Sequence, residues 1–332
     1  MTDDSQSVRS TEARGGDEAP ARQTLEHSLQ RILWELRPYL HDIVIIGGWV
    51  PYLYQRYGSF PAWRGRLALT AEVDVLVSRE VTPGDRPTIP EILESAGFQP
   101  VNATSNAAVW ANEPERGEKV EFLVPHAGPY RDLGRVVPVR AQRGMGAISL
   151  TALEVLQQHT GVLRVFARSA DRNETWVEVR VPVLGAYVLN KAATFQKRSP
   201  LASATENSRT TVTRSNPKKA KDLLYLRDLM HGGAAIVTVI EADIASILER
   251  DPALQHLVDA AANSLDAATR VESQPAATLL QEVGAMLSER EPAFTSDAAA
   301  ADVLGHLTDL ADILLGFRSS HTARPEAEDD EI

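Results

Sequence analysis

The chain has 332 residues, 43% of them apolar, and a formal net charge of −11, so it is long enough for two globular domains. It contains no cysteine, which excludes disulfides, thiolate zinc sites and cysteine nucleophiles. Its eight histidines show no pair at metal-ligand spacing, so any metal must be held by oxygen atoms. The negative charge argues against a general nucleic-acid coat protein.

Both ends of the chain are polar. Residues 1–22 are rich in glycine, serine and charge, and residues 321–332 form an acidic run, so we expect two disordered tails. No apolar stretch approaches the roughly 20 residues of a membrane-spanning helix, and the N-terminus has no apolar signal core. We therefore expect a cytoplasmic protein without a membrane partner.

The first half of the chain alternates between helical and strand patterns. Apolar spacing predicts a helix over 22–40, a buried strand over 41–48, and a helix that begins after Gly48. Further on, the same reasoning gives a strand over 67–78, a helix over 89–98 closed by Gly97, and strands over 107–112 and 119–125.

The second half turns from mixed patterns to purely helical ones. We expect a helix over 148–160, a hairpin over 163–182, a helix over 183–198, a polar insertion from Ser199 to Asn216, and a helix over 218–231. From Gly232 onward the chain is rich in alanine and leucine at helical spacing. The predicted fold class is α/β (α+β): a mixed sheet flanked by helices over 23–231, then an all-helical C-terminal domain over 232–320.

Two glycines end the first strand, in the sequence IIGGWVPYLY. A strand that stops on Gly47 and Gly48 before a helix lets the backbone approach a ligand, and the helix start offers unpaired N–H groups to a phosphate. The alternative is that the pair serves only the turn.

Two carboxylates lie on the next strand, in LTAEVDVLVS. Side chains at i and i+2 share a face, so Glu72 and Asp74 are neighbours while Val73 and Val75 face the other way. The two like charges repel, and a divalent cation such as Mg²⁺ or Mn²⁺ would compensate. Glu121, in KVEFLVP, offers a third carboxylate. The alternative is solvated acids on an edge or exposed strand.

A basic block stands out in this acidic protein. From Lys191 to Lys221 there are eight basic residues against the single acidic residue Glu206; they are Lys191, Lys197, Arg198, Arg209, Arg214, Lys218, Lys219 and Lys221. The block indicates a polyanionic partner, and its alternative is a solvated loop.

Together these motifs resemble the nucleotidyltransferase fold of the DNA polymerase β superfamily. They are most similar to the branch that holds the AbiEii-type toxins of type IV toxin-antitoxin systems and their uncharacterised bacterial relatives. The resemblance covers roughly residues 30–230. It departs from the usual pattern in having Glu72 in place of an aspartate, and long segments before the acids and between the two basic helices.

The resemblance implies a role for each matching residue. Gly47 and Gly48 would hold the triphosphate, and Glu72, Asp74 and Glu121 would be the metal ligands and the catalytic acids. Lys191, a catalytic residue, and Arg198 would grip the nucleotide phosphates and stabilise the leaving pyrophosphate. The nucleotide site would be completed by the Lys-Asp pair of the following helix, Lys221 and Asp222.

The function that follows is transfer of NMP from an NTP to a hydroxyl acceptor with Mg²⁺ or Mn²⁺ as cofactor. The acceptor would be RNA (tRNA) or a protein, with the chain acting as a type IV toxin beside an antitoxin protein. Two alternatives stay open: a nucleotidyltransferase for a small molecule such as an antibiotic, and an inactive module that binds nucleotide or a partner.

Overall fold

The structure is a computed structural model that describes residues 18–60, 63, 66–101, 106–112, 118–128, 132–195, 217–270 and 274–322. Arg198 and the insertion from Ser199 to Asn216 lie outside the described residues, as do most of the two predicted tails. The first helix begins at Glu18, inside the tail predicted over 1–22, and the last helix ends at Thr322, inside the tail predicted over 321–332.

A mixed seven-stranded sheet forms the centre of the first part of the chain. Its main path runs β1-β2-β5-β4-β3, with β7 beside β5 and β6 beside β7. The pairs β2–β5 and β5–β7 are parallel and the others antiparallel. The strands are β1 (Val44–Ile46), β2 (Glu72–Leu76), β3 (Gln99–Pro100), β4 (Val109–Ala111), β5 (Lys119–Pro125), β6 (Val136–Pro138) and β7 (Gly146–Leu150).

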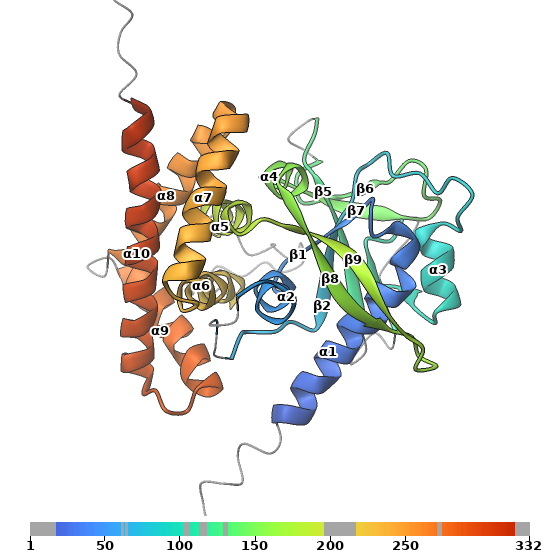
Figure 1. Cartoon of the computed structure of the whole chain (residues 1–332), viewed down its shortest axis with the longest axis horizontal. Coiled ribbons are helices and arrows are strands. Elements are labelled where there is room, and N and C mark those ends of the chain that lie inside the picture. The colour runs from blue at the N-terminus through green and yellow to red at the C-terminus, as the bar shows by residue number, and fades with distance from the viewer. Residues whose placement is uncertain are drawn as a thin grey trace, which may run out of the picture.

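Helices and a long hairpin surround this sheet. They are α1 (Glu18–Glu35), a 3-10 turn (Arg37–Tyr39), α2 (Trp49–Tyr57), α3 (Ile89–Ser95), α4 (Glu154–Gln158) and the antiparallel pair β8 (Thr160–Arg168) and β9 (Glu174–Pro182). Helix α1 lies across the hairpin (Figure 1). Thr88 and Glu91 start α3 with a reciprocal capping box, which explains why the short IPEILES segment is helical.

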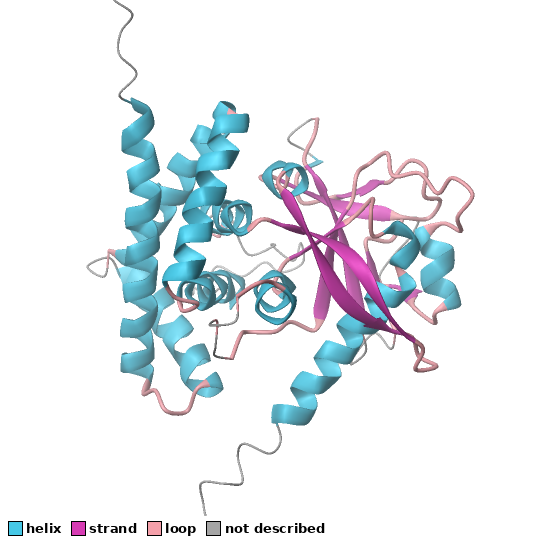
Figure 2. Ribbon diagram, in the orientation of Figure 1, coloured by secondary structure: helices cyan, strands magenta, loops and turns pink. Residues whose placement is uncertain are grey.

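The remaining helices gather on the opposite side of the molecule from the strands, with α2 between the two groups (Figures 1 and 2). They are α5 (Leu184–Thr194), α6 (Pro217–Met230), α7 (Ala234–Arg250), α8 (Gln255–Thr269), α9 (Gln274–Arg290) and α10 (Ser296–Thr322). The predicted fold class, a mixed sheet with flanking helices followed by a helical C-terminal region, is confirmed.

The helix predicted over 148–160 is wrong in its first part. Ile148 belongs to β7, which runs parallel to β5, and the helix there is only α4. The left-handed backbone of Ala152, with φ of 60°, separates the two elements. Apolar spacing alone did not distinguish a buried strand followed by a short helix from one longer helix.

Within the part of the chain that the structure describes, no single helix is long and apolar enough to span a membrane. One bent pair, Lys218–Met230 with Ala234–Arg250, passes the same length and composition criteria together, with a bend of 109°.

The C-terminal helices pack closely on α5 and α6. At Gly185 the contact is at backbone level: an added Cβ would lie 2.6 Å from Cβ of Asp243 and 2.9 Å from the backbone nitrogen of Ile244, both on α7. The Asp243 carboxylate also accepts a hydrogen bond of 3.0 Å from the Gly185 N–H, in the first turn of α5. The junction of α5 with α7 therefore requires glycine at this position.

This packing predicts that a change from glycine to alanine has opposite effects on the free energy of unfolding at two helical glycines. Gly185→Ala should lower the free energy of unfolding by about 1–3 kcal/mol, because the backbone atoms of α7 cannot move aside easily. Gly305→Ala, on α10, should raise it by about 0.5–1 kcal/mol through helix propensity, because in the described part of the chain nothing lies within 4 Å of the added Cβ. Urea unfolding of both variants measures the difference, and a loss of stability at both positions would contradict it.

Candidate functional site

Three carboxylates meet on one face of the central sheet. In the parallel pairing of β2 with β5, Asp74 lies opposite Glu121, and Glu72 stands two residues before Asp74. Val73 and Val75 are fully buried on the other face, as the alternation predicts. One carboxylate oxygen from each of Glu72, Asp74 and Glu121 lies within 4.8 Å of the others. The sheet thus brings together all three residues that the sequence singled out as acids.

The chemistry of this donor set suits a divalent cation. The three side chains offer only carboxylate oxygens, the ligands that Mg²⁺ and Mn²⁺ prefer. At an effective dielectric near 20, two unit charges at about this separation repel by roughly 3.5 kcal/mol, and solvent screening lowers the repulsion here because Glu72 is exposed. A cation bound between the three carboxylates would offset their repulsion.

Both glycines of the first turn are required by their neighbours. Gly47 has a φ of +73°, and an added Cβ would lie only 1.8 Å from Oδ2 of Asp74. At Gly48, the residue that caps α2, an added Cβ would lie 2.2 Å from the Tyr225 hydroxyl oxygen. The backbone of this turn therefore lies directly against Asp74 and Tyr225. Contact of either glycine with a triphosphate stays a prediction.

Side chains from other elements hold the backbone that leads into β2. The indole Nε1 of Trp49 donates to the carbonyl oxygen of Glu72 at 3.0 Å. Thr70 Oγ1 accepts from the Glu72 N–H at 3.4 Å, and the side chains of Thr70 and Tyr225 interact in turn. The sequence does not single out Trp49 and Tyr225, because each has the pattern of an ordinary aromatic residue at a helical core position.

Helix α6 places a lysine beside the acids. Burial lowers the pKa of Lys221, and the negative charges of Glu72 and Asp74 oppose that effect. Burial of Tyr225 first, and then the negative charges of Asp74, Asp222 and Asp228, raise the pKa of its hydroxyl well above the ordinary value. The Tyr225 hydroxyl therefore stays protonated across the physiological pH range.

Lys191 and Asp222 form a buried ion pair behind this surface. Lys191 Nζ lies 2.7 Å from Asp222 Oδ1, and the two side chains are 7% and 3% exposed. The same ammonium lies 5.4 Å from the ring centroid of Tyr225. The structure thus brings Lys191, Asp222 and Lys221 to the region of the acids. The charges of Glu72 and Asp74 act on the pKa of Lys221. Arg198, the remaining predicted phosphate ligand, lies outside the described residues.

A pocket of about 390 Å³ adjoins this site and shares Lys221 with it. Its lining combines apolar side chains with four cationic ones, which are Arg22, Arg66, Lys221 and Arg290. Arg22 pairs with Glu26, and Arg290 with Asp228, so part of this charge is offset. The lining residues come from α1, the segment before β2, α6 and α9.

The fit of Gly47 against Asp74 predicts the effect of adding one methyl group. Gly47→Ala should displace the Asp74 carboxylate and weaken Mn²⁺ binding by about tenfold or more, since groups that orient a ligand typically have effects of this size. Gly134→Ala is the matched control, because Gly134 has nearly the same left-handed φ, +74°, but no atom of the described residues lies within 4 Å of the added Cβ. Both variants should lose stability through backbone strain. Titration with Mn²⁺ followed by electron paramagnetic resonance separates them, and equal Mn²⁺ affinity would contradict the steric argument.

Comparison with known proteins places this geometry in a family. A model of the nucleotidyltransferase family matches residues 26–233, which include every described residue of the site from Gly47 to Asp222. No curated protein and no solved structure matches the chain. The matched segment is well over half of the chain and ends just before α7. The chain therefore belongs to the nucleotidyltransferase family.

Proposed function

We propose that the protein is a metal-dependent nucleotidyltransferase that moves NMP from an NTP to a hydroxyl group of RNA, with tRNA as the leading candidate, or of a protein. The observation that carries the proposal is the cluster of Glu72, Asp74 and Glu121, with their oxygens within 4.8 Å of one another. Membership of the nucleotidyltransferase family supports nucleotidyl transfer in general. A cytoplasmic location, where NTP and Mg²⁺ are at hand, belongs to the same proposal.

The reaction exchanges one phosphoanhydride bond for one phosphoester bond. The acceptor oxygen attacks the α-phosphorus, the bond from that phosphorus to the bridging oxygen breaks, and pyrophosphate leaves. When bound, Mg²⁺ or Mn²⁺ would act as a Lewis acid on the α-phosphate. Glu72 and Asp74 would hold the cation, and Glu121 would either take the proton of the acceptor hydroxyl or serve as a further ligand.

The lysine side chains of α5 and α6 would stabilise the departing pyrophosphate. The negative charges of Glu72 and Asp74 act on the ammonium group of Lys221, which can contact phosphate oxygens. The charge of Lys191 is offset by Asp222, so Lys191 would act by fixing the position of α6 against α5. Gly47, Gly48 and Arg198 complete the proposed nucleotide site. Most of the catalytic effect would come from positioning and fixed charge.

The pocket beside the site favours an anionic acceptor. Four cationic side chains line it together with apolar ones such as Leu224 and Met286, a combination that suits a phosphate-bearing group with an apolar ring. The positive charge of this lining, although offset in part by Glu26 and Asp228, disfavours a cationic antibiotic. This favours RNA over a small cationic acceptor. We further propose that the chain acts as an AbiEii-type toxin, with an antitoxin protein as its partner.

The first test is binding of the nucleotide. A ligand that binds only the folded state stabilises it by mass action, so NTP should raise the melting temperature more with Mg²⁺ or Mn²⁺ than with EDTA. Asp74→Asn should abolish the metal-dependent part of this shift. Equal shifts with metal and with EDTA in the wild-type protein would rule out the three-carboxylate metal site.

The second test is transfer itself. Asp74→Asn keeps the size of the side chain but removes the charge that a cation requires, so NMP transfer should fall by roughly a thousandfold or more. The variant should melt at or slightly above the wild-type temperature, because one of several repelling charges is gone. The assay combines labelled NTPs with total RNA and, separately, total protein as acceptors. Retained transfer by a folded Asp74→Asn variant would refute the mechanism.

A further inference from the structure

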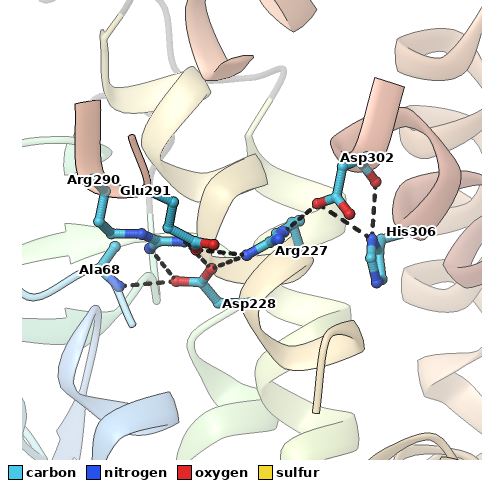
Figure 3. Close-up of polar contacts among 7 residues, drawn as sticks. All are labelled: Ala68, Arg227, Asp228, Arg290, Glu291, Asp302 and His306. Atoms are coloured by element: carbon cyan, nitrogen blue, oxygen red, sulfur yellow. Dashed lines mark hydrogen bonds and ion pairs between the residues drawn. The ribbon is translucent and has the colours of Figure 1, made fainter. Parts of the chain in front are cut away.

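A network of buried charges connects the C-terminal helices to α6. Arg227 and Asp228, neighbours on α6, are each 1% exposed. Arg227 Nε donates to Asp302 Oδ2 on α10 at 2.7 Å, and its Nη1 donates to Glu291 at 3.3 Å. Arg290, at the end of α9, binds both oxygens of Asp228 through two hydrogen bonds of 2.6 Å (Figure 3).

The network also reaches the segment that leads into β2. Asp228 Oδ2 accepts a hydrogen bond of 2.8 Å from the backbone N–H of Ala68, which lies 160 residues earlier in the chain (Figure 3). Ala68 precedes the metal-site residue Glu72 by four positions. The carboxylate of Asp228 is therefore shared between the C-terminal helix α9 and the approach to the acidic cluster.

The segment from Arg66 to Ala71 has no strand or helix hydrogen bonds of its own. Bonds from other elements help to hold it: Asp228 accepts from the Ala68 N–H, and the side chain of Tyr225 contacts Thr70. At the first residue of β2, the Trp49 indole donates to the Glu72 carbonyl oxygen. Loss of the Ala68 contact would loosen the segment that leads into Glu72, which is paired with Lys119 of β5. Since Glu72 is the first residue of β2, its carboxylate would shift with it.

Asp228 can serve as this acceptor only while its charge is compensated. A buried carboxylate without a partner is strongly disfavoured, and the two parallel bonds from Arg290 are the strongest kind of compensation available. Burial opposes the charge of Arg290, but the bonds and charge of Asp228 outweigh it and hold the pKa of Arg290 above its ordinary value. Arg227 adds only one bond to Asp228, at 3.4 Å.

We propose that Arg290, outside the segment matched to the family, is a positioning residue for the metal site: it fixes Asp228, which fixes Ala68 and hence Glu72. The inference rests on the proposed metal-binding function of Glu72. It assigns the C-terminal helices a part in the active unit, because one of them supplies the group that keeps a metal ligand in place.

The test uses the full-length protein and two readouts that need no turnover. Arg290→Met should weaken binding of Mn²⁺ alone by about tenfold or more, as is typical for groups behind a metal ligand. It should also speed hydrogen exchange in the peptide that covers residues 66–72. Asp302→Asn is the control, since it removes a charge from the same network without touching Asp228. That variant should have a lower melting temperature but keep the wild-type Mn²⁺ affinity and the wild-type rate of hydrogen exchange in residues 66–72.

A pair of double variants isolates the hydrogen bond to Ala68 and avoids a buried unpaired charge. Arg290→Met with Asp228→Asn keeps an acceptor oxygen for the Ala68 N–H, whereas Arg290→Met with Asp228→Leu has nearly the same shape and no acceptor. The asparagine version should regain Mn²⁺ affinity close to wild type, and the leucine version should bind about tenfold more weakly. This comparison still decides the matter where Arg290→Met alone does not fold.

The outcomes separate this inference from the proposed function. Equal Mn²⁺ affinity and equal exchange in the two double variants would overturn the role of Arg290 while leaving the metal site intact. A wild-type protein that binds no Mn²⁺ would overturn the metal site, and the assignment of Arg290 to it, together.

Discussion

The parallel pairing of β2 with β5 is the constraint on which the site depends. This register sets Asp74 beside Glu121, and the pleat puts Glu72 on the same face. A register shift of one residue would set Asp74 beside Val120 or Phe122. It would then turn the Glu121 carboxylate toward the core if β5 turned over, or the carboxylates of β2 if β2 did. The buried valines of β2 prevent that shift, because exposing Val73 and Val75 would lose their burial energy. Apolar packing on one face thus holds like charges together on the other.

Helix α6 organises the second layer of the site. Asp222, Tyr225 and Asp228 follow one another at intervals of three residues, so they lie along one side of the helix. The first binds Lys191 of α5, the second covers Gly48, and the third holds Ala68. Each contact joins a different part of the chain to the same rigid element. The geometry of the acids therefore depends on how α6 is seated between the sheet and the C-terminal helices.

Local patterns in the sequence were enough to predict the fold class and the acidic cluster. Alternation of apolar and acidic residues in EVDVL, and the strand pattern of KVEFLVP, are visible within a few residues, and the sheet brings them together. The helix expected over 148–160 failed because the short buried strand β7 and an apolar helix turn have similar compositions.

Other features could not be read from the sequence because they depend on distant partners. Nothing local to Asp228 indicates that it binds Ala68 and Arg290, and nothing local to Lys191 indicates its burial against Asp222. The fit of Gly47 against Asp74 is of the same kind: glycine suggests a close approach, but not to which atom. Long-range contacts between single side chains have no periodic signature.

The bond from Arg290 to Asp228 has a consequence for the order in which the molecule is made. The acids are translated by residue 121, but the arginine that completes their support is translated only near the end of the described chain. Since chains are made from the N-terminus at about 5–20 residues per second, a nascent chain would carry the acids for roughly 8–34 s before that arginine exists. Ribosome-bound intermediates would therefore lack an ordered centre. Under the proposed function, nucleotidyl transfer would therefore begin only after α9 has been made.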